Sequence, residues 1–251
     1  MASSAGIVII GDEILSGKFA DENAQFLIGE LRPLGVSLRR VAIIPDEVED
    51  IGETVRAFSE RFDHVFTSGG VGPTHDDVTM SGIAVGFATR VTRHPELEER
   101  IREHMGERMT ETHLRFAEVP DGAHLVFGEG AVWPVVAFRN VYILPGVPSI
   151  FRRKFDSIKE RFRGEPAALG RLYCKGDESS LAGTLGEVVE RYPDVKLGSY
   201  PRDDSSAFQV IVTIESRDHA RARAAFDALR ERLGDVVHAV EPPSPPDESR
   251  S

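Results

Sequence analysis

Apolar runs and amphipathic stretches alternate along the first two thirds of the chain. Ile7 to Ile10 form an apolar run that ends at a glycine, which predicts a buried strand and a turn. Apolar residues recur at helical spacing in residues 21–35, and Asp21 is placed to cap that helix. The same patterns predict strands at residues 36–44, 64–70 and 140–148, and helices at residues 48–62, 78–90, 94–118 and 149–162. This order predicts an α/β domain over residues 1–163, with a doubly wound, mostly parallel sheet.

The last third of the chain has a different order of elements. A candidate linker at residues 163–170 is followed by a strand at residues 171–175, a helix at 178–191, strands near 196–199 and 208–215, a helix at 218–233 and a strand at 236–240. The order β-α-β-β-α-β is typical of ferredoxin-like domains. We therefore predict a smaller ferredoxin-like α+β domain over residues 170–240. The proline-rich, polar residues 241–251 predict a disordered tail.

Charge and composition narrow the classes of partner. The chain of 251 residues has 41 acidic and 30 basic side chains, for a net charge of −11. This balance argues against nucleic-acid binding, which needs a basic surface. No apolar run is long enough to cross a membrane, and there is no pattern of a signal peptide. Cys174 is the single cysteine, so an intrachain disulfide is impossible, and we expect a cytoplasmic protein.

Four polar loops follow the predicted parallel strands, and their sequences are GDEILSGK, IPDEVED, TSGGVGPTHDD and LPGVPS. In an open parallel sheet, ligands bind outside the carboxyl ends of the strands, so these loops are expected to meet at one edge. Gly69, Gly70 and Gly72 allow a ligand to approach the backbone, and successive N–H groups there can hold a phosphate. The alternative is a tight turn with no ligand. The spacing matches neither the dinucleotide fingerprint nor the P-loop.

Acidic residues follow the same strand ends as the glycines, or the end of the preceding strand. Asp46 follows one strand, and Asp76 and Asp77 follow the next. Carboxylates from two loops beside a phosphate suit a divalent cation such as Mg²⁺, Mn²⁺ or Co²⁺. Helix capping is the alternative role for Asp46 and for Asp77. For Asp12 and Glu13, at the end of the first strand, the alternative is a solvated turn.

Four segments together resemble a known family. GDEILSGKFADENAQFL, IPDEVEDI, TSGGVGPTHDDVT and LPGVP, within residues 11–148, are similar to the molybdopterin-binding fold family of MoaB- and Mog-like proteins. Two branches are most similar, namely the N-terminal domain of the competence/damage-inducible CinA proteins and the molybdopterin-binding-like domain of FAD synthases. CinA-type domains have lysine and glutamine where this chain has Arg115 and Phe116.

The resemblance implies a metal-dependent pyrophosphatase that hydrolyses FAD or ADP-ribose to AMP and a phosphorylated product. It implies catalytic roles for Asp46 and Asp77, with the metal held by Asp46, Asp76 and Asp77. The substrate-binding residues that we predict are Gly11, Asp12, Glu13, Asn23, Ser68, Gly69, Gly70, Gly72, Pro73, Thr74, Gly146 and Pro148. A homo-oligomer, dimer or trimer, is also expected.

Two other functions remain open on the sequence. The first is a molybdopterin-binding protein or adenylyltransferase of molybdenum cofactor biosynthesis. The second is a non-catalytic, nucleotide-binding regulatory module.

Overall fold

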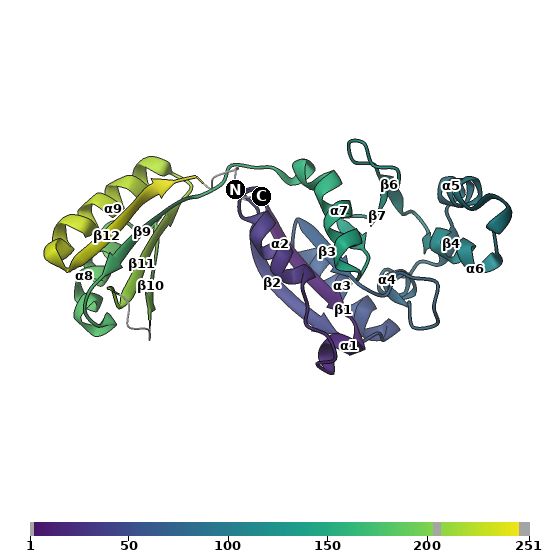
Figure 1. The fold of residues 1–251 in the computed structure, drawn as a ribbon, viewed down its shortest axis with the longest axis horizontal. Coiled ribbons are helices and arrows are strands. Elements are labelled where there is room, and N and C mark those ends of the chain that lie inside the picture. The colour runs from purple at the N-terminus through teal and green to yellow at the C-terminus, as the bar shows by residue number, and fades with distance from the viewer. Residues whose placement is uncertain (1–2, 203–206, 246–251) are drawn as a thin grey trace. The chain divides into compact units, whose positions relative to one another are not determined.

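The chain forms two compact units in the computed structural model, which describes residues 3–202 and 207–245 (Figure 1). The first unit ends at Gly164 and the second begins at Glu165. No helix within these described residues is long and apolar enough to span a membrane.

The first unit is built on a six-stranded sheet with the order β2-β1-β3-β8-β7-β6. The four parallel strands are β2 (Ser37–Ile44), β1 (Ser4–Ile10), β3 (His64–Ser68) and β8 (Val141–Leu144). Two antiparallel strands, β7 (Val135–Phe138) and β6 (His124–Val126), extend the sheet beyond β8. The predicted α/β fold with a mostly parallel sheet is thus confirmed, although the two antiparallel strands were not predicted.

Side chains that alternate along β1 divide the core of the first unit into two layers. Ile7 and Ile9 face the layer that contains α2 (Asn23–Leu31) and α7 (Pro148–Ile158), whereas Val8 and Ile10 face α3 (Val48–Arg61) and α4 (Thr79–Gly86). Helices therefore cover both faces of the sheet, as the doubly wound pattern predicts. Two short helical segments complete this part, α1 (Asp12–Leu15) after β1 and the 3₁₀-helix η3 (Lys159–Phe162) after α7.

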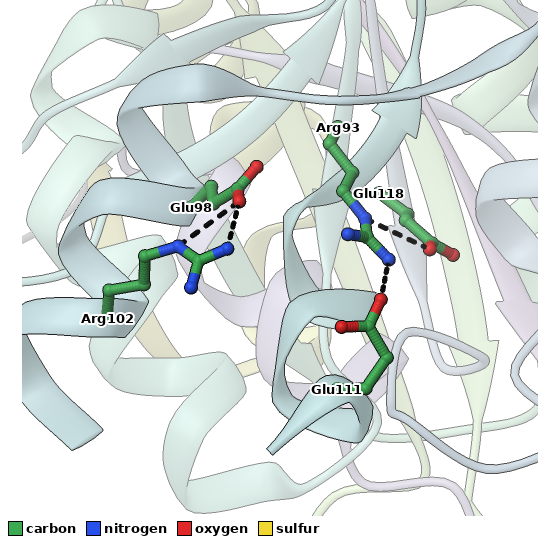
Figure 2. Close-up of polar contacts among 5 residues, drawn as sticks. All are labelled: Arg93, Glu98, Arg102, Glu111 and Glu118. Atoms are coloured by element: carbon green, nitrogen blue, oxygen red, sulfur yellow. Dashed lines mark hydrogen bonds and ion pairs between the residues drawn. The ribbon is translucent and has the colours of Figure 1, made fainter. Parts of the chain in front are cut away.

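Residues 91–120 form a small lobe rather than the helix predicted at residues 94–118. The lobe contains β4 (Val91–Arg93), α5 (Pro95–Met105), η1 (Gly106–Arg108), α6 (Glu111–Leu114), η2 (Arg115–Ala117) and β5 (Glu118–Pro120). Gly106, with a φ of +51°, ends α5 and breaks the predicted helix. Figure 2 shows that Arg93 of β4 makes ion pairs with Glu111 of α6 and with Glu118 of β5.

The second unit has a four-stranded antiparallel sheet with the order β10-β11-β9-β12. Its elements are β9 (Ala168–Cys174), α8 (Glu178–Arg191), β10 (Lys196–Pro201), β11 (Val210–Ser216), α9 (His219–Leu233), η4 (Gly234–Val236) and β12 (Val237–Ser244). Asp177 and Asp218 cap the two α-helices through their side chains. This small antiparallel α+β unit confirms the second part of the predicted fold class.

The predicted tail at residues 241–251 is wrong at its start. Strand β12 continues to Ser244 and pairs with β9, so residues 241–244 belong to the sheet. Residues 246–251 lie outside the described part of the chain. The prolines in β12 are tolerated because this strand lies at the edge of the sheet, where backbone N–H groups need no partner strand.

Candidate functional site

The loops after β1 and β2 are joined through Asp46. The backbone N–H of Gly11 donates to the Ile44 carbonyl at 3.1 Å, and the N–H of Asp12 donates to Oδ2 of Asp46 at 2.9 Å. Asp46 therefore does not cap α3, whose N-cap is Glu47 without a side-chain hydrogen bond. Asp46 instead accepts from the first N–H group of α1, and its carboxylate is directed toward the loop of β1.

The glycine loop after β3 is held in a conformation that requires glycine. Gly69 and Gly70 have φ values of +105° and +62°. A Cβ atom on Gly69 would lie only 2.0 Å from the Ile10 carbonyl oxygen, and one on Gly70 would lie 2.3 Å from Oγ1 of Thr79. The loop is therefore packed directly against β1 and against the start of α4, as a phosphate-binding loop would have to be.

Hydrogen bonds turn the carbonyl groups of this loop inward. Thr79 donates from Oγ1 to the Gly69 carbonyl at 2.9 Å and from its N–H to the Gly70 carbonyl at 3.0 Å. Within the described residues, the N–H groups of Gly70, Val71 and Gly72 donate to no protein acceptor. Three donors close together are thus available to an anionic ligand.

Asn23 stabilises the glycine loop through buried hydrogen bonds. Its side chain is only 4% exposed, and Nδ2 donates both to Oγ of Ser68 and to the Gly146 carbonyl, each at 2.8 Å. A Cβ atom on Gly146 would be 3.3 Å from Cα of Gly69, so the loops after β3 and β8 touch. Asn23 and Ser68, which we predicted as substrate-binding residues, are buried and hold these loops together.

The acidic residues after the glycine loop are arranged differently from the prediction. Oδ2 of Asp77 accepts hydrogen bonds from the N–H of Thr74, at 2.8 Å, and from the Thr74 hydroxyl. Asp77 therefore closes a turn of the loop and does not cap α4, whose N-cap is Val78. The Asp76 side chain is 65% exposed beside His75.

The predicted metal ligands Asp46, Asp76 and Asp77 do not form a ready-made site. In the part of the chain that the structure describes, no three His, Cys, Asp or Glu side chains are placed to hold a metal together. The N–H of Thr74 donates to the Asp77 carboxylate within the glycine loop. A divalent cation such as Mg²⁺ needs only one or two protein carboxylates when substrate phosphates supply other oxygen ligands.

The surroundings of Asp46 shift the pKa of its carboxyl group. Burial raises the pKa of the Asp46 carboxyl, the N–H of Asp12 opposes that shift, and the charges of Glu13, Asp12 and Asp76 raise the pKa further. A cation beside Asp46 would relieve this mutual repulsion. The donor set therefore fits a divalent cation held chiefly by Asp46, with neighbouring carboxylates and ligand oxygens.

The remaining predicted residues lie along the same edge of the sheet. Asp12 and Glu13 are exposed at the start of α1, and the Glu13 carboxylate folds back over Gly11. The carbonyl of Pro73 and the side chain of Thr74 belong to the glycine loop, and Pro148 begins α7 directly after the loop of β8. The structure thus places all four predicted loops together.

A small cavity of about 50 Å³ lies against the glycine loop. The loop and Met80 and Ser81 of α4 line one side, and residues of the 91–120 lobe, including Arg115, Phe116 and Glu118, line the other. Nη1 of Arg115 donates to the Pro73 carbonyl at 2.6 Å, which ties the lobe to the loop. Glu118 is paired with Arg93, as Figure 2 shows.

Arg115 and Phe116 were not among the predicted site residues. In the sequence they stood out only because they replace the lysine and glutamine of CinA-type domains. That replacement was the available signal, since helical periodicity placed both residues on an ordinary charged helix.

Comparison with known proteins agrees with this architecture. Residues 6–164 match the family described as "Probable molybdopterin binding domain". The chain belongs to this molybdopterin-binding domain family. Residues 166–241 match the family described as "FAD synthase, middle domain". The family resemblance predicted from the four loops is thereby confirmed.

Individual relatives cover both units of the chain. A probable FAD synthase of Caenorhabditis elegans is 31% identical over an alignment of 264 positions that covers 94% of this chain and 51% of that protein. The chain thus spans about half the length of that relative. An archaeal protein of Archaeoglobus fulgidus is 32% identical, covering 91% of this chain and 97% of its own length.

A solved CinA structure resembles part of the chain. The crystal structure of the protein CinA from Thermoplasma acidophilum is 28% identical with a TM-score of 0.58, and it covers 64% of this chain and 98% of that one. Its coverage corresponds to the length of the molybdopterin-binding domain alone.

Proposed function

We propose that the first unit hydrolyses the pyrophosphate bond of a nucleotide such as FAD or ADP-ribose, releasing AMP and a second phosphorylated product with the help of a divalent cation. The observation that carries this proposal is the set of three open N–H groups at Gly70, Val71 and Gly72, residues that line a small cavity together with Asp77 and Arg115. Backbone N–H donors, a guanidinium and a carboxylate around one small cavity suit a negatively charged diphosphate.

The chemistry assigns a role to each group. A water oxygen adds to the phosphorus on the adenosine side, and the bond from that phosphorus to the bridging oxygen breaks, so that this oxygen leaves on the second phosphate. Asp77, whose carboxylate lines the cavity beside the open N–H groups, receives the proton of the water, while Asp46 would hold the cation. The open N–H groups stabilise charge that builds on the phosphoryl oxygens. A bound divalent cation would supply Lewis-acid polarisation of the phosphate.

The two supporting resemblances point to different ligands. Relatives named probable FAD synthase, together with the match to the FAD synthase middle domain, support a flavin dinucleotide. The family description of the first unit supports a molybdopterin ligand, which would use the same phosphate donors. A molybdopterin-binding or adenylyltransferase function is therefore the second candidate, and a non-catalytic nucleotide-binding module is the third.

The test is product analysis with purified full-length chain. FAD, ADP-ribose and NAD are incubated separately with Mg²⁺, Mn²⁺ or Co²⁺, and AMP is quantified by chromatography. We expect metal-dependent AMP from FAD or ADP-ribose, at least 100-fold less AMP from Asp46→Asn, and a similar loss from Asp77→Asn. Asp50→Asn, at an exposed acid in the first turn of α3, is the matched control and should retain activity.

The outcomes separate the three functions. AMP release that Asp46→Asn leaves intact would refute the site. No AMP from any substrate, together with molybdopterin binding at micromolar affinity, would favour the second candidate. Tight nucleotide binding without turnover would favour the regulatory module.

A further inference from the structure

Phe116 is an exposed aromatic residue at the cavity beside the glycine loop. It lines this cavity together with Gly70, Val71 and Gly72, and it is 45% exposed. It belongs to none of the four apolar clusters of the described residues, and no aromatic ring among those residues contacts it. Packing within the chain therefore does not account for a phenylalanine at this position.

The backbone on both sides of Phe116 is fixed. Ala117 is fully buried, and its carbonyl accepts a hydrogen bond from the N–H of His94 at 2.8 Å. Nη1 of Arg115 donates to the Pro73 carbonyl at 2.6 Å. An aromatic side chain has only two rotatable bonds, so on a fixed backbone it loses little conformational entropy when a ligand packs against it. The short helix η2 thus presents a preorganised ring to the cavity.

Two apolar side chains line the cavity with Phe116, namely Met80 of α4 and Val91 of β4. Met80 packs against apolar residues on the α3 side of the sheet and against those of the lobe, so its position is well supported. Val91 pairs with Pro120 in the short β4-β5 ladder. Methionine sulfur also makes favourable contacts with aromatic rings. We define the ring wall as Met80, Val91 and Phe116.

Most polar side chains of the cavity already have a protein partner. Glu118 makes an ion pair with Arg93 (Figure 2), and the Asp77 carboxylate accepts a hydrogen bond within the glycine loop. Arg115 is bonded to that loop as well. Adenine has hydrogen-bonding groups around most of its edge, and these are costly to bury without partners. An isoalloxazine ring has a dimethylbenzene end without such groups, so it suits the ring wall better.

We propose that the ring wall binds the isoalloxazine ring of a flavin nucleotide whose phosphates bind the open N–H groups of the glycine loop, and that Phe116 thereby determines a preference for FAD over ADP-ribose. This inference rests on the proposed pyrophosphatase function and adds the part of the substrate that is recognised. FAD and ADP-ribose share the adenosine diphosphate half. Only a contact with the other half can therefore discriminate between them, and there FAD has a three-ring system where ADP-ribose has a sugar.

Steady-state AMP release from FAD and from ADP-ribose by the full chain tests the preference. Phe116→Leu keeps an apolar side chain but removes the flat ring, and it should lower kcat/KM for FAD by roughly 5–100-fold, the loss expected for one stacked ring. It should leave kcat/KM for ADP-ribose unchanged, and Phe116→Tyr should retain the wild-type value for FAD. Phe127→Leu is the matched control, at a phenylalanine that is 40% exposed and does not line the cavity, and it should behave as wild type.

Flavin binding is measured separately, without turnover. Riboflavin 5′-phosphate keeps the ring and one phosphate, and its fluorescence is titrated with wild type, Phe116→Trp and Phe127→Trp. An indole stacked on a flavin quenches its emission, so Phe116→Trp should quench saturably and more strongly than the other two proteins.

The two assays separate this inference from the proposed function. No AMP from either nucleotide with wild type would refute the hydrolase, while saturable quenching by Phe116→Trp would still support the ring wall. AMP release with equal losses for both substrates in Phe116→Leu, or with no loss for FAD, would overturn the inference and leave the hydrolase standing. The absence of additional quenching by Phe116→Trp would also overturn it.

Discussion

Replacing Gly69 by alanine tests whether the glycine loop is held by close packing. Two effects act on the variant. A φ of +105° strains an alanine backbone by roughly 1–2 kcal/mol, offset by about 0.4–1 kcal/mol from the stiffer unfolded chain. The new Cβ atom would also lie 2.0 Å from the Ile10 carbonyl oxygen, a backbone atom of a central strand that cannot move aside. Overpacking of this kind adds about 1–3 kcal/mol.

Gly17→Ala is the matched control, because Gly17 also has a positive φ, of +72°, but no atom lies within 4 Å of a Cβ there. Urea unfolding is followed by fluorescence of Trp133, the single tryptophan, which belongs to the first unit. We expect Gly69→Ala to lose about 1–3 kcal/mol more unfolding free energy than Gly17→Ala. Equal losses in the two variants would refute the close packing and leave only the backbone strain.

Three further predictions concern charged groups. Burial and like charges raise the pKa of Asp46 above 3.8, so the ionised carboxylate destabilises the fold at pH values above its pKa. Asp46→Asn should therefore raise the unfolding free energy at pH 7 by roughly a few tenths of a kcal/mol per like-charge neighbour. It should have no such effect at pH 3, where the carboxyl group is already neutral. In steady-state assays, Arg115→Ala should raise KM for the nucleotide on the order of 10–100-fold, because a hydrogen bond to a charged phosphate is lost. Arg115→Lys should give an intermediate KM, and kcat should change little in both variants. Burial lowers the pKa of Lys154 to about 8, so between pH 8 and 10.5 the unfolded chain binds more protons there and wild-type stability should rise with pH. In urea titrations, Lys154→Met should be up to about 3 kcal/mol more stable than wild type at pH 7 and should show no such rise.

The sequence predicts those parts of the fold that depend on periodicity. Apolar runs such as Ile7–Ile10 and the helical spacing in residues 48–62 give the parallel strands and their helices directly. The meeting of four loops at one edge follows from topology, because the carboxyl ends of parallel strands coincide. Strands of three or four residues such as β4 and β6 are too short to show a period, so the lobe and the antiparallel extension were missed.

Side-chain direction in the site could not be predicted in the same way. Asp46 and Asp77 are equivalent in the sequence, as acids after two consecutive strands of the chain, β2 and β3, between which β1 lies in the sheet. The structure separates them, because Thr74 holds the Asp77 carboxylate while Asp46 faces the loop of β1. Arg115 reaches the Pro73 carbonyl across 42 residues of sequence, a contact that depends on how the lobe folds back. Such choices depend on tertiary packing and not on local pattern.

Energetically unfavourable features are concentrated at the carboxyl ends of the parallel strands, where the four loops meet. Asn23 Oδ1 and Thr67 Oγ1 are two of the three buried side-chain atoms that lack a protein partner in the described part of the chain. Positive φ angles at Gly69 and Gly70 and the raised pKa of Asp46 lie in the same region. Lys154, by contrast, is a single unfavourable burial whose Nζ still donates to a carbonyl. Isolated strain is tolerated anywhere in a fold, but several independent kinds at the meeting point of four loops are expected where binding, rather than stability, has shaped the residues.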